Sequence, residues 1–169
     1  QGIAAQINGQ MDTVMEFANA IKDAMEALTQ AGDQLKDLRN QLKARRNELR
    51  DLRAKHEAHL GTEPKAPSKV PDFVTEWKTE TFTDANGNEA SRQVPAKYDE
   101  EGFAAAQDKY TADKTAWEGT KADLETAISD KEGVIADLLK GIDSTLKDIG
   151  KLGEEIEKLT EDKQRADTE

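Results

Sequence analysis

The side chains most able to do chemistry in this sequence are two histidines three residues apart, His56 and His59. A transition-metal site needs two or three further ligands, and this spacing supplies only a pair, with no cysteine anywhere in the chain. Both histidines also fall on the core positions of the pattern around them. We therefore interpret them as polar residues at the fraying end of a helix and expect no metal site.

No other group of residues predicts catalysis. The sequence has no glycine-rich phosphate loop and no nucleophile placed beside a base, and its carboxylates are expected on solvated helix faces. We therefore expect no enzyme, no catalytic residue and no cofactor-binding residue.

The residues before His56 predict a long helix with one apolar stripe. From Ile3 onward, apolar residues recur three and four apart, the heptad pattern of a coiled coil. No proline precedes Pro64, so we expect an unbroken helix over 1–60, roughly 85 Å long, with Gly61 as its C-terminal cap. The core positions hold Ile7, Val14, Ile21, Leu28, Leu35, Leu42 and Leu49 in one set, and Phe17, Ala24, Ala31, Leu38 and Leu52 in the other, with Gln10 and Arg45 as exceptions.

A second helix with the same repeat is expected over 99–166. Its aromatic residues Phe103, Tyr110 and Trp117 are seven apart, which is more typical of a widened core than of a ligand site. The apolar repeat continues through Leu124, Ile128, Ile135, Leu138, Ile142, Ile149, Leu152, Ile156 and Leu159. Each interior glycine costs on the order of 1 kcal/mol relative to Ala, so these glycines either allow bending or close packing, or merely weaken the helix. They are Gly119, Gly133, Gly141, Gly150 and Gly153.

The segment 61–98 between the helices predicts a linker followed by a β-hairpin. Residues 61–71 are rich in proline and have no apolar period, so they are expected to be extended. "DFVTEWKTETFT" and "EASRQV" predict two strands, joined by a type I′ turn at Asn86-Gly87. A bare hairpin is marginal in water, so we expect Phe73, Trp77 or Phe82 to dock on the helix ends, or the hairpin edge to pair with another molecule.

Two helices of matched length with a compact insert predict a mainly α fold. We expect a long antiparallel coiled-coil helical hairpin with a small β-hairpin insert at its tip, forming a single elongated domain over 1–169. A chain that is 36% hydrophobic and 35% charged is too polar for a spherical core. Since two helices make a thin core, we also expect further helices, from another copy or from missing chain, to pack on this pair.

The charge of the chain limits its partners. With 24 basic and 35 acidic side chains, the net charge is −11, which disfavours nucleic acid. The basic segment "KARRNELRDLRAK", residues 43–55, is expected to form ion pairs with the acidic second helix. Neither a spanning helix nor a cleavable leader is expected, so membrane contact would require segments absent from this chain.

The organisation of the chain resembles that of the needle-tip, filament and translocator proteins of type III secretion systems. The resemblance lies in a heptad-rich N-terminal helix, the segment "KVPDFV" before a small β insert, a long C-terminal helix and the lack of cysteine. It implies an exported, leaderless protein whose helices assemble with other subunits and whose insert faces outward. The expected interaction residues are Phe73, Trp77, Phe82, Asn86, Gly87, Phe103, Tyr110 and Trp117. The alternative is a cytoplasmic coiled-coil scaffold or prefoldin-like holding chaperone.

Overall fold

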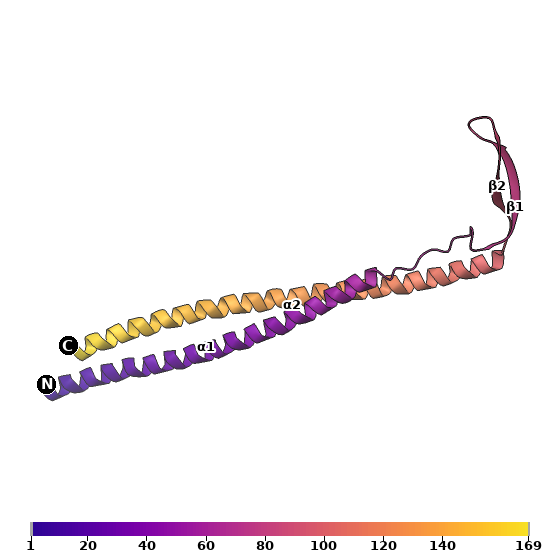
Figure 1. Ribbon diagram of the computed structural model, residues 1–169. Helices are drawn as coiled ribbons and strands as arrows, with labels where there is room; N and C mark the ends of the chain where they lie inside the picture. The colour runs from indigo at the N-terminus through magenta and orange to yellow at the C-terminus, as the bar shows by residue number, and fades with distance from the viewer. Residues whose placement is uncertain (1, 169) are drawn as a thin grey trace. The chain divides into compact units, whose positions relative to one another are not determined.

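Residues 2–168 form four regular elements in the order helix, strand, strand, helix (Figure 1). The structure is a computed structural model that describes residues 2–168. Its elements are α1 (Ile3–Leu60), β1 (Val74–Thr83), β2 (Glu89–Tyr98) and α2 (Glu100–Thr168). The two helices contain 58 and 69 residues, so the chain is mainly α, as the sequence predicts.

The chain divides into two compact units, and each contains part of both helices. The terminal unit consists of Gln1–Asp51 and Ile128–Glu169, and the hairpin unit consists of Leu52–Ala127. Both strands and the linker therefore belong to the hairpin unit.

In the terminal unit, α1 and α2 run antiparallel. Near one end of the unit, the Gln10 side-chain amide donates a hydrogen bond of 2.7 Å to the carbonyl of Ala166. Toward the other end, the Lys131 ammonium contacts the Glu48 carboxylate at 2.7 Å. Because higher residue numbers on α1 meet lower residue numbers on α2, the predicted helical hairpin is confirmed.

The heptad stripes lie where the two helices meet, and we call this contact the seam. The predicted core positions of α1 from Val14 to Leu52 are all buried or half-buried, whereas Ile7 is 50% exposed. On α2, the predicted apolar positions from Phe103 to Leu159 are likewise buried or half-buried. The three-and-four spacing therefore identified the face that each helix buries.

The seam also contains polar residues that the sequence reading did not assign to it. Thr145 is 4% exposed, and its hydroxyl donates to the Gly141 carbonyl at 2.8 Å, which satisfies the buried oxygen. Lys131 and Lys163 are further such positions in the terminal unit, and Lys114 and Lys121 occupy seam positions in the hairpin unit. Thr145 and Lys131 interrupt the seven-residue spacing of the leucine and aromatic residues, and Lys114 and Lys121 continue the isoleucine spacing upstream of Ile128, so the spacing alone could have identified them.

The core of the terminal unit is thin. Ala24, Leu42 and Leu49 are its buried apolar residues among those described, with 6–8% of their surface exposed. A helix with one partner can bury only one stripe, so most seam residues keep one side in water. A fully buried Leu contributes about 1.5–3 kcal/mol relative to an exposed one, and a half-buried Leu correspondingly less.

In the hairpin unit, α1 ends at Leu60 as expected, but its last turn is not capped as expected. Gly61 does not adopt the left-handed conformation that a glycine cap requires, since Gly87 is the only glycine described with a positive φ. Instead, the Gly61 amide bonds the Ala58 carbonyl at 3.2 Å, and the Thr62 hydroxyl bonds the His59 carbonyl at 2.7 Å. A threonine side chain and a tightened turn thus close the helix.

The start of α2 is fixed by Asp99, which lies just before its first helical residue. The Asp99 carboxylate accepts a hydrogen bond of 2.9 Å from the Gly102 amide, the usual arrangement of an N-terminal cap. The Asp99 amide donates to the carbonyl of Phe73 at 2.7 Å. One residue therefore joins the base of the β-hairpin to the beginning of α2.

The two strands form an antiparallel ribbon, but its turn is not the predicted type I′ turn. A type I′ turn needs a positive φ at both central residues, and of Asn86 and Gly87 only Gly87 has one, at 83°. The Gly87 amide bonds the Asp84 carbonyl at 3.0 Å, and the Asp84 amide bonds the Asn88 carbonyl at 2.8 Å. These bonds define a three-residue loop in which Gly87 takes the left-handed position.

Asp84 explains why the longer loop replaces the type I′ turn. Its carboxylate accepts hydrogen bonds from the amides of Asn86 and Asn88, both at 2.9 Å. These bonds hold the chain in an Asx turn that begins two residues before Asn86. The second strand also runs further than "EASRQV", because its pairing continues to Tyr98 opposite Val74.

Residues 63–68 of the linker form neither helix nor strand, and turns lie at both of its ends. Within residues 2–168, neither helix contains an apolar stretch that would span a bilayer.

Removing the Asp99 cap should destabilise the hairpin unit. Asp99→Ala deletes the carboxylate that holds the first turn of α2, so we expect the free energy of unfolding to fall by about 1 kcal/mol. Urea denaturation followed by circular dichroism measures the loss. Asp108→Ala, an exposed change further along α2, should lower stability far less, and equal losses in the two variants would contradict the assignment of the cap.

Candidate interaction surface of the β-hairpin

The β-hairpin is the least covered part of the hairpin unit. Nine of the ten residues of β1 are exposed, and six of the ten in β2 are exposed as well. Trp77 keeps 44% of its surface accessible and Phe82 keeps 36%, although both are large aromatic residues. The ribbon thus presents apolar side chains on a surface that is otherwise polar.

Trp77 and Phe82 lie on opposite faces of the ribbon. Side chains alternate along a strand, and the pairing is regular from Trp77↔Pro95 to Phe82↔Ala90. On the Phe82 face, the Arg92 guanidinium stacks over the ring, 4.8 Å from its centroid. The other face is lined by hydroxyl and amide groups, including the Gln93 amide that donates to Thr79 at 3.0 Å.

An aromatic contact anchors the base of the ribbon. The rings of Phe73 and Phe103 meet edge to face with their centroids 5.4 Å apart. The Lys69 ammonium lies 4.4 Å from the Tyr98 ring centroid and 3.0 Å from the Glu100 carboxylate. Phe73 therefore docks on the start of α2, as predicted for one of the three aromatic residues, while Trp77 and Phe82 remain exposed on the ribbon.

Trp117 serves a different role, because it joins the two helices of the hairpin unit. Its indole stacks on the His59 imidazole with ring centroids 5.1 Å apart, and the indole N–H donates to the His59 carbonyl at 2.9 Å. His59 Nε2 lies 2.8 Å from the Trp117 carbonyl, so Nε2 carries a proton and donates in return. We call this reciprocal pair the His59–Trp117 clasp.

Charged groups surround the clasp. The Lys114 ammonium lies 4.8 Å from the Trp117 ring centroid and forms an ion pair with the Glu63 carboxylate. The hydrogen bond from Lys114 is the main reason that the pKa of Glu63 lies below its ordinary value, and the same bond raises the pKa of Lys114. One turn earlier on α1, His56 Nε2 lies 3.3 Å from the Glu125 carboxylate. Both histidines thus have partners on or near the seam.

The eight predicted interaction residues separate into two groups. Trp77, Phe82, Asn86 and Gly87 are exposed on the ribbon. The remaining four, Phe73, Phe103, Tyr110 and Trp117, are buried or half-buried in the hairpin unit. The aromatic stripe of α2 therefore packs inside the unit, and the candidate surface consists of the ribbon alone. The seven-residue spacing of Phe103, Tyr110 and Trp117 predicts a place in the core for them, whereas nothing in the sequence separates Phe73 from the exposed residues of the insert.

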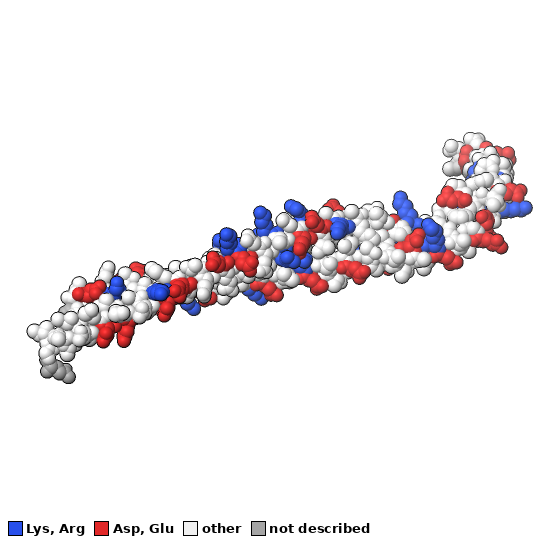
Figure 2. All heavy atoms as spheres, turned by 90° about the horizontal axis from the view of Figure 1, so that it is seen from below, with Lys and Arg blue, Asp and Glu red and all other residues white. Residues whose placement is uncertain are grey.

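In the basic segment 43–55, Arg45 and Arg50 pair with acidic residues of the same helix rather than of α2. Arg45 pairs with Glu48 in the same helix at 3.2 Å, and Glu48 in turn binds Lys131, which is the main cause of its lowered pKa. Lys43 and Arg46 make no ion pair within the part of the chain that the structure describes. On the face shown in Figure 2, Lys and Arg side chains stand out from the helical surface. The charges of Lys43 and Arg46 therefore remain available to a partner.

No protein-family model, curated protein or solved structure matches this chain. The chemistry of the exposed surfaces is therefore the basis for the function proposed below.

Replacing the indole of the His59–Trp117 clasp should weaken the hairpin unit. Trp117→Phe keeps much of the apolar packing but removes the N–H that bonds the His59 carbonyl, so we expect a loss of about 1 kcal/mol in the free energy of unfolding. Trp77→Phe is the matched control, because Trp77 is exposed on the ribbon. Chemical denaturation measures both, and an equal effect at the two positions would contradict the role of the clasp.

The Glu63–Lys114 pair should make the stability of the protein depend on acid pH. The pKa of Glu63 is lower in the folded protein, so its ionised form stabilises the fold above the ordinary value of 4.5, and this contribution disappears as the pH falls through the folded value. Glu63→Gln should therefore lower the melting temperature at pH 7 but have little effect below the folded pKa. Glu57→Gln, at an exposed position on α1, should leave the pH profile unchanged. A Glu63→Gln effect that is the same at every pH would contradict this role.

Proposed function

We propose that this protein is a non-enzymatic coiled-coil assembly protein that acts through protein–protein contacts. The observation that carries the proposal is the exposed β1–β2 ribbon, which is fixed at its base by Phe73 and Phe103 but is open on both faces. Exposed aromatic residues such as Trp77 and Phe82 are the types enriched at protein interfaces. A ribbon held in this way can present them to another protein.

The edges of the ribbon support the same proposal. The sheet has two strands, so each strand has a neighbour on one side only. An unpaired edge can accept a strand from a partner, with backbone hydrogen bonds supplying affinity. The net charge of −11 disfavours nucleic acid as that partner.

The narrower proposal is an exported, leaderless component of a type III secretion tip, filament or translocator. The resemblance in organisation supports it: two coiled-coil helices would assemble with other subunits, and the insert between them would face outward. In this proposal the ribbon contacts the next subunit or the target surface.

The same ribbon between coiled-coil helices supports a second candidate, a cytoplasmic scaffold or prefoldin-like holding chaperone. The two candidates differ in where the chain is found and in what it does to unfolded proteins. Intact chain in the culture supernatant of the source organism supports export. Retention in the cells, together with suppression of the aggregation of a denatured client protein, supports the chaperone.

Removing the exposed aromatic side chains should weaken partner binding without unfolding the protein. Trp77→Ala combined with Phe82→Ala should weaken capture of the partner from its source organism by roughly 30-fold, the effect of losing an interface hot spot of about 2 kcal/mol. The matched control is Leu60→Ala combined with Val70→Ala, since those residues are 41% and 43% exposed in the same unit. If a short glycine linker in place of residues 74–98 leaves every interaction intact, the ribbon is only a connection between helices.

A further inference from the structure

Beside the residues that it buries in the seam, α1 carries an exposed stripe of residues with the same three-and-four spacing. We call this exposed stripe stripe 1. Met11, Met15 and Met25 on it are 58%, 60% and 52% exposed, large fractions for such apolar side chains. Up to Gly32 the stripe is uncharged except for Lys22, and after that it is basic. Its members are Met11, Met15, Ala18, Lys22, Met25, Thr29, Gly32, Lys36, Arg39, Lys43, Arg46 and Arg50, all of them exposed.

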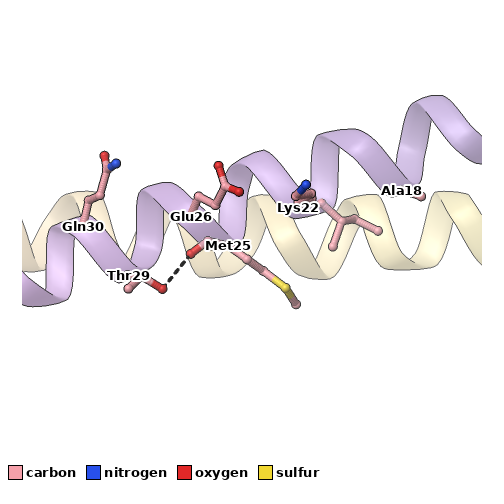
Figure 3. Close-up of a pocket in the computed structure, with 7 residues that line it drawn as sticks. Ala18, Lys22, Met25, Glu26, Thr29 and Gln30 are labelled. Atoms are coloured by element: carbon pink, nitrogen blue, oxygen red, sulfur yellow. Dashed lines mark hydrogen bonds between the residues drawn. The ribbon is translucent and has the colours of Figure 1, made fainter.

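Part of stripe 1 borders an open hollow of about 550 Å³. Figure 3 shows Ala18, Lys22, Met25 and Thr29 of this hollow along α1, with α2 behind the helix. The Thr29 hydroxyl donates a hydrogen bond of 3.1 Å to the Met25 carbonyl, so a partner need not supply an acceptor for it. The hollow is therefore a mainly apolar depression on an exposed helix face.

A complementary stripe, stripe 2, runs along α2 on the same side of the terminal unit. Met11 of stripe 1 and Asp167 of stripe 2 line one open hollow, which places the two stripes side by side there. The opposite side of the seam has a separate hollow that includes Ala27 and Asp148. Stripe 2 consists of Ser129, Glu132, Ala136, Leu139, Asp143, Leu146, Gly150, Gly153, Glu157, Thr160, Gln164 and Asp167, and all are exposed.

The register of the seam sets which residues of the two stripes are level with each other. A Cβ built on Gly141 would lie 3.7 Å from a Leu38 methyl group, so these two residues are level. Counting outward from this pair in opposite directions places Lys22 level with Glu157 and Lys36 level with Asp143. Each of these lysines on stripe 1 therefore has an acid at its own level on stripe 2.

The same register matches large side chains with glycines. Met25 is level with Gly153, and Leu146 is level with Gly32, to within one residue. A Cβ added at Gly32 or Gly153 would meet nothing within 4 Å, so neither space is filled inside the chain. A partner with the same spacing can therefore fill the spaces at Gly32 and Gly153 and cover the exposed side chains of Met25 and Leu146.

We propose that a second copy of this chain covers these stripes, related by a two-fold axis parallel to the helices. In that arrangement stripe 1 of each copy packs on stripe 2 of the other at the same level. Met25 of one copy enters the space at Gly153 of the other, and Lys22 pairs with Glu157. The product is an antiparallel four-helix bundle, and the inference rests on the proposed assembly function because it names one of its partners.

A second copy fits better than an unrelated partner because one chain carries both stripe 1 and the stripe 2 that is complementary to it. An isologous interface requires a surface to be complementary to itself under a two-fold rotation, and the stripes meet this requirement in both charge and size. Residues 11–50 of a helix span about 60 Å, and a contact about 10 Å wide would bury roughly 600 Å² on each copy. The total of roughly 1,200 Å² reaches the lower end of stable interfaces.

The first experiment measures molar mass with and without the glycine space. Sedimentation equilibrium of the full chain should give twice the monomer mass of 18.7 kDa at micromolar concentrations. Gly153→Met fills the space and should weaken the dimer at least ten-fold, while the better helix propensity of Met keeps the monomer folded. Gly133→Met is the matched control, since Gly133 lies outside the stripes and also has open space around it.

The second experiment exchanges charges across the interface. Lys22→Glu or Glu157→Lys alone places like charges together at two symmetric sites and should weaken the dimer by roughly ten-fold, whereas the double variant should recover most of the loss. A chain that remains monomeric at high concentration, a dimer insensitive to Gly153→Met, or a double variant no better than the single ones would each overturn the inference. Capture of a partner through Trp77 and Phe82 is measured separately, so these failures would leave the proposed function standing.

Discussion

The structure depends on one constraint, the single seam between α1 and α2. With only one partner, each helix buries one stripe of side chains. Few of the described residues are almost completely buried, and Leu42 and Leu49 are two of them. Burial therefore contributes less free energy of folding per residue than in a compact domain. Polar contacts between particular residues of the two helices become more important as a result. The Gln10 amide and the Glu48–Lys131 pair fix the level of one helix against the other in the terminal unit. The same register determines which exposed side chains are available together to a partner.

The hairpin unit uses the same kind of seam for a different purpose. The His59–Trp117 clasp and the Glu63–Lys114 pair close the end of α1 against α2. Asp99 and the Phe73–Phe103 contact then fix the base of the ribbon to the start of α2. The exposed strands are thus held by interactions at the base of the ribbon. This arrangement leaves Trp77 and Phe82 free without leaving the ribbon unsupported.

Heptad spacing was sufficient to predict both helices, their antiparallel packing and the seam residues from Val14 to Leu159. It was not sufficient for contacts that depend on a single side chain outside the pattern. Asp84 turns the expected type I′ turn into a longer loop, and Thr62 replaces Gly61 as the closing residue of α1. The different roles of Phe73 and Trp77 were not predictable either, because both are aromatic residues of the insert and differ only in what covers them. Stripes 1 and 2 were hidden for another reason: their complementarity becomes visible only when the register of the two helices is known.

The central claim is that one seam determines both the fold and the surface used for assembly. Zero-length carbodiimide cross-linking tests this claim most directly. The reaction joins a lysine amine to a carboxylate in contact with it, and an equal mixture of unlabelled and ¹⁵N-labelled chains separates contacts within a chain from those between chains. The seam predicts a Glu48–Lys131 link in chains of one label, and the proposed interface predicts a Lys22–Glu157 link that joins the two labels. Links from Glu48 to a different level of α2 would contradict the register. A Lys22–Glu157 link that never joins the two labels would contradict the assembly.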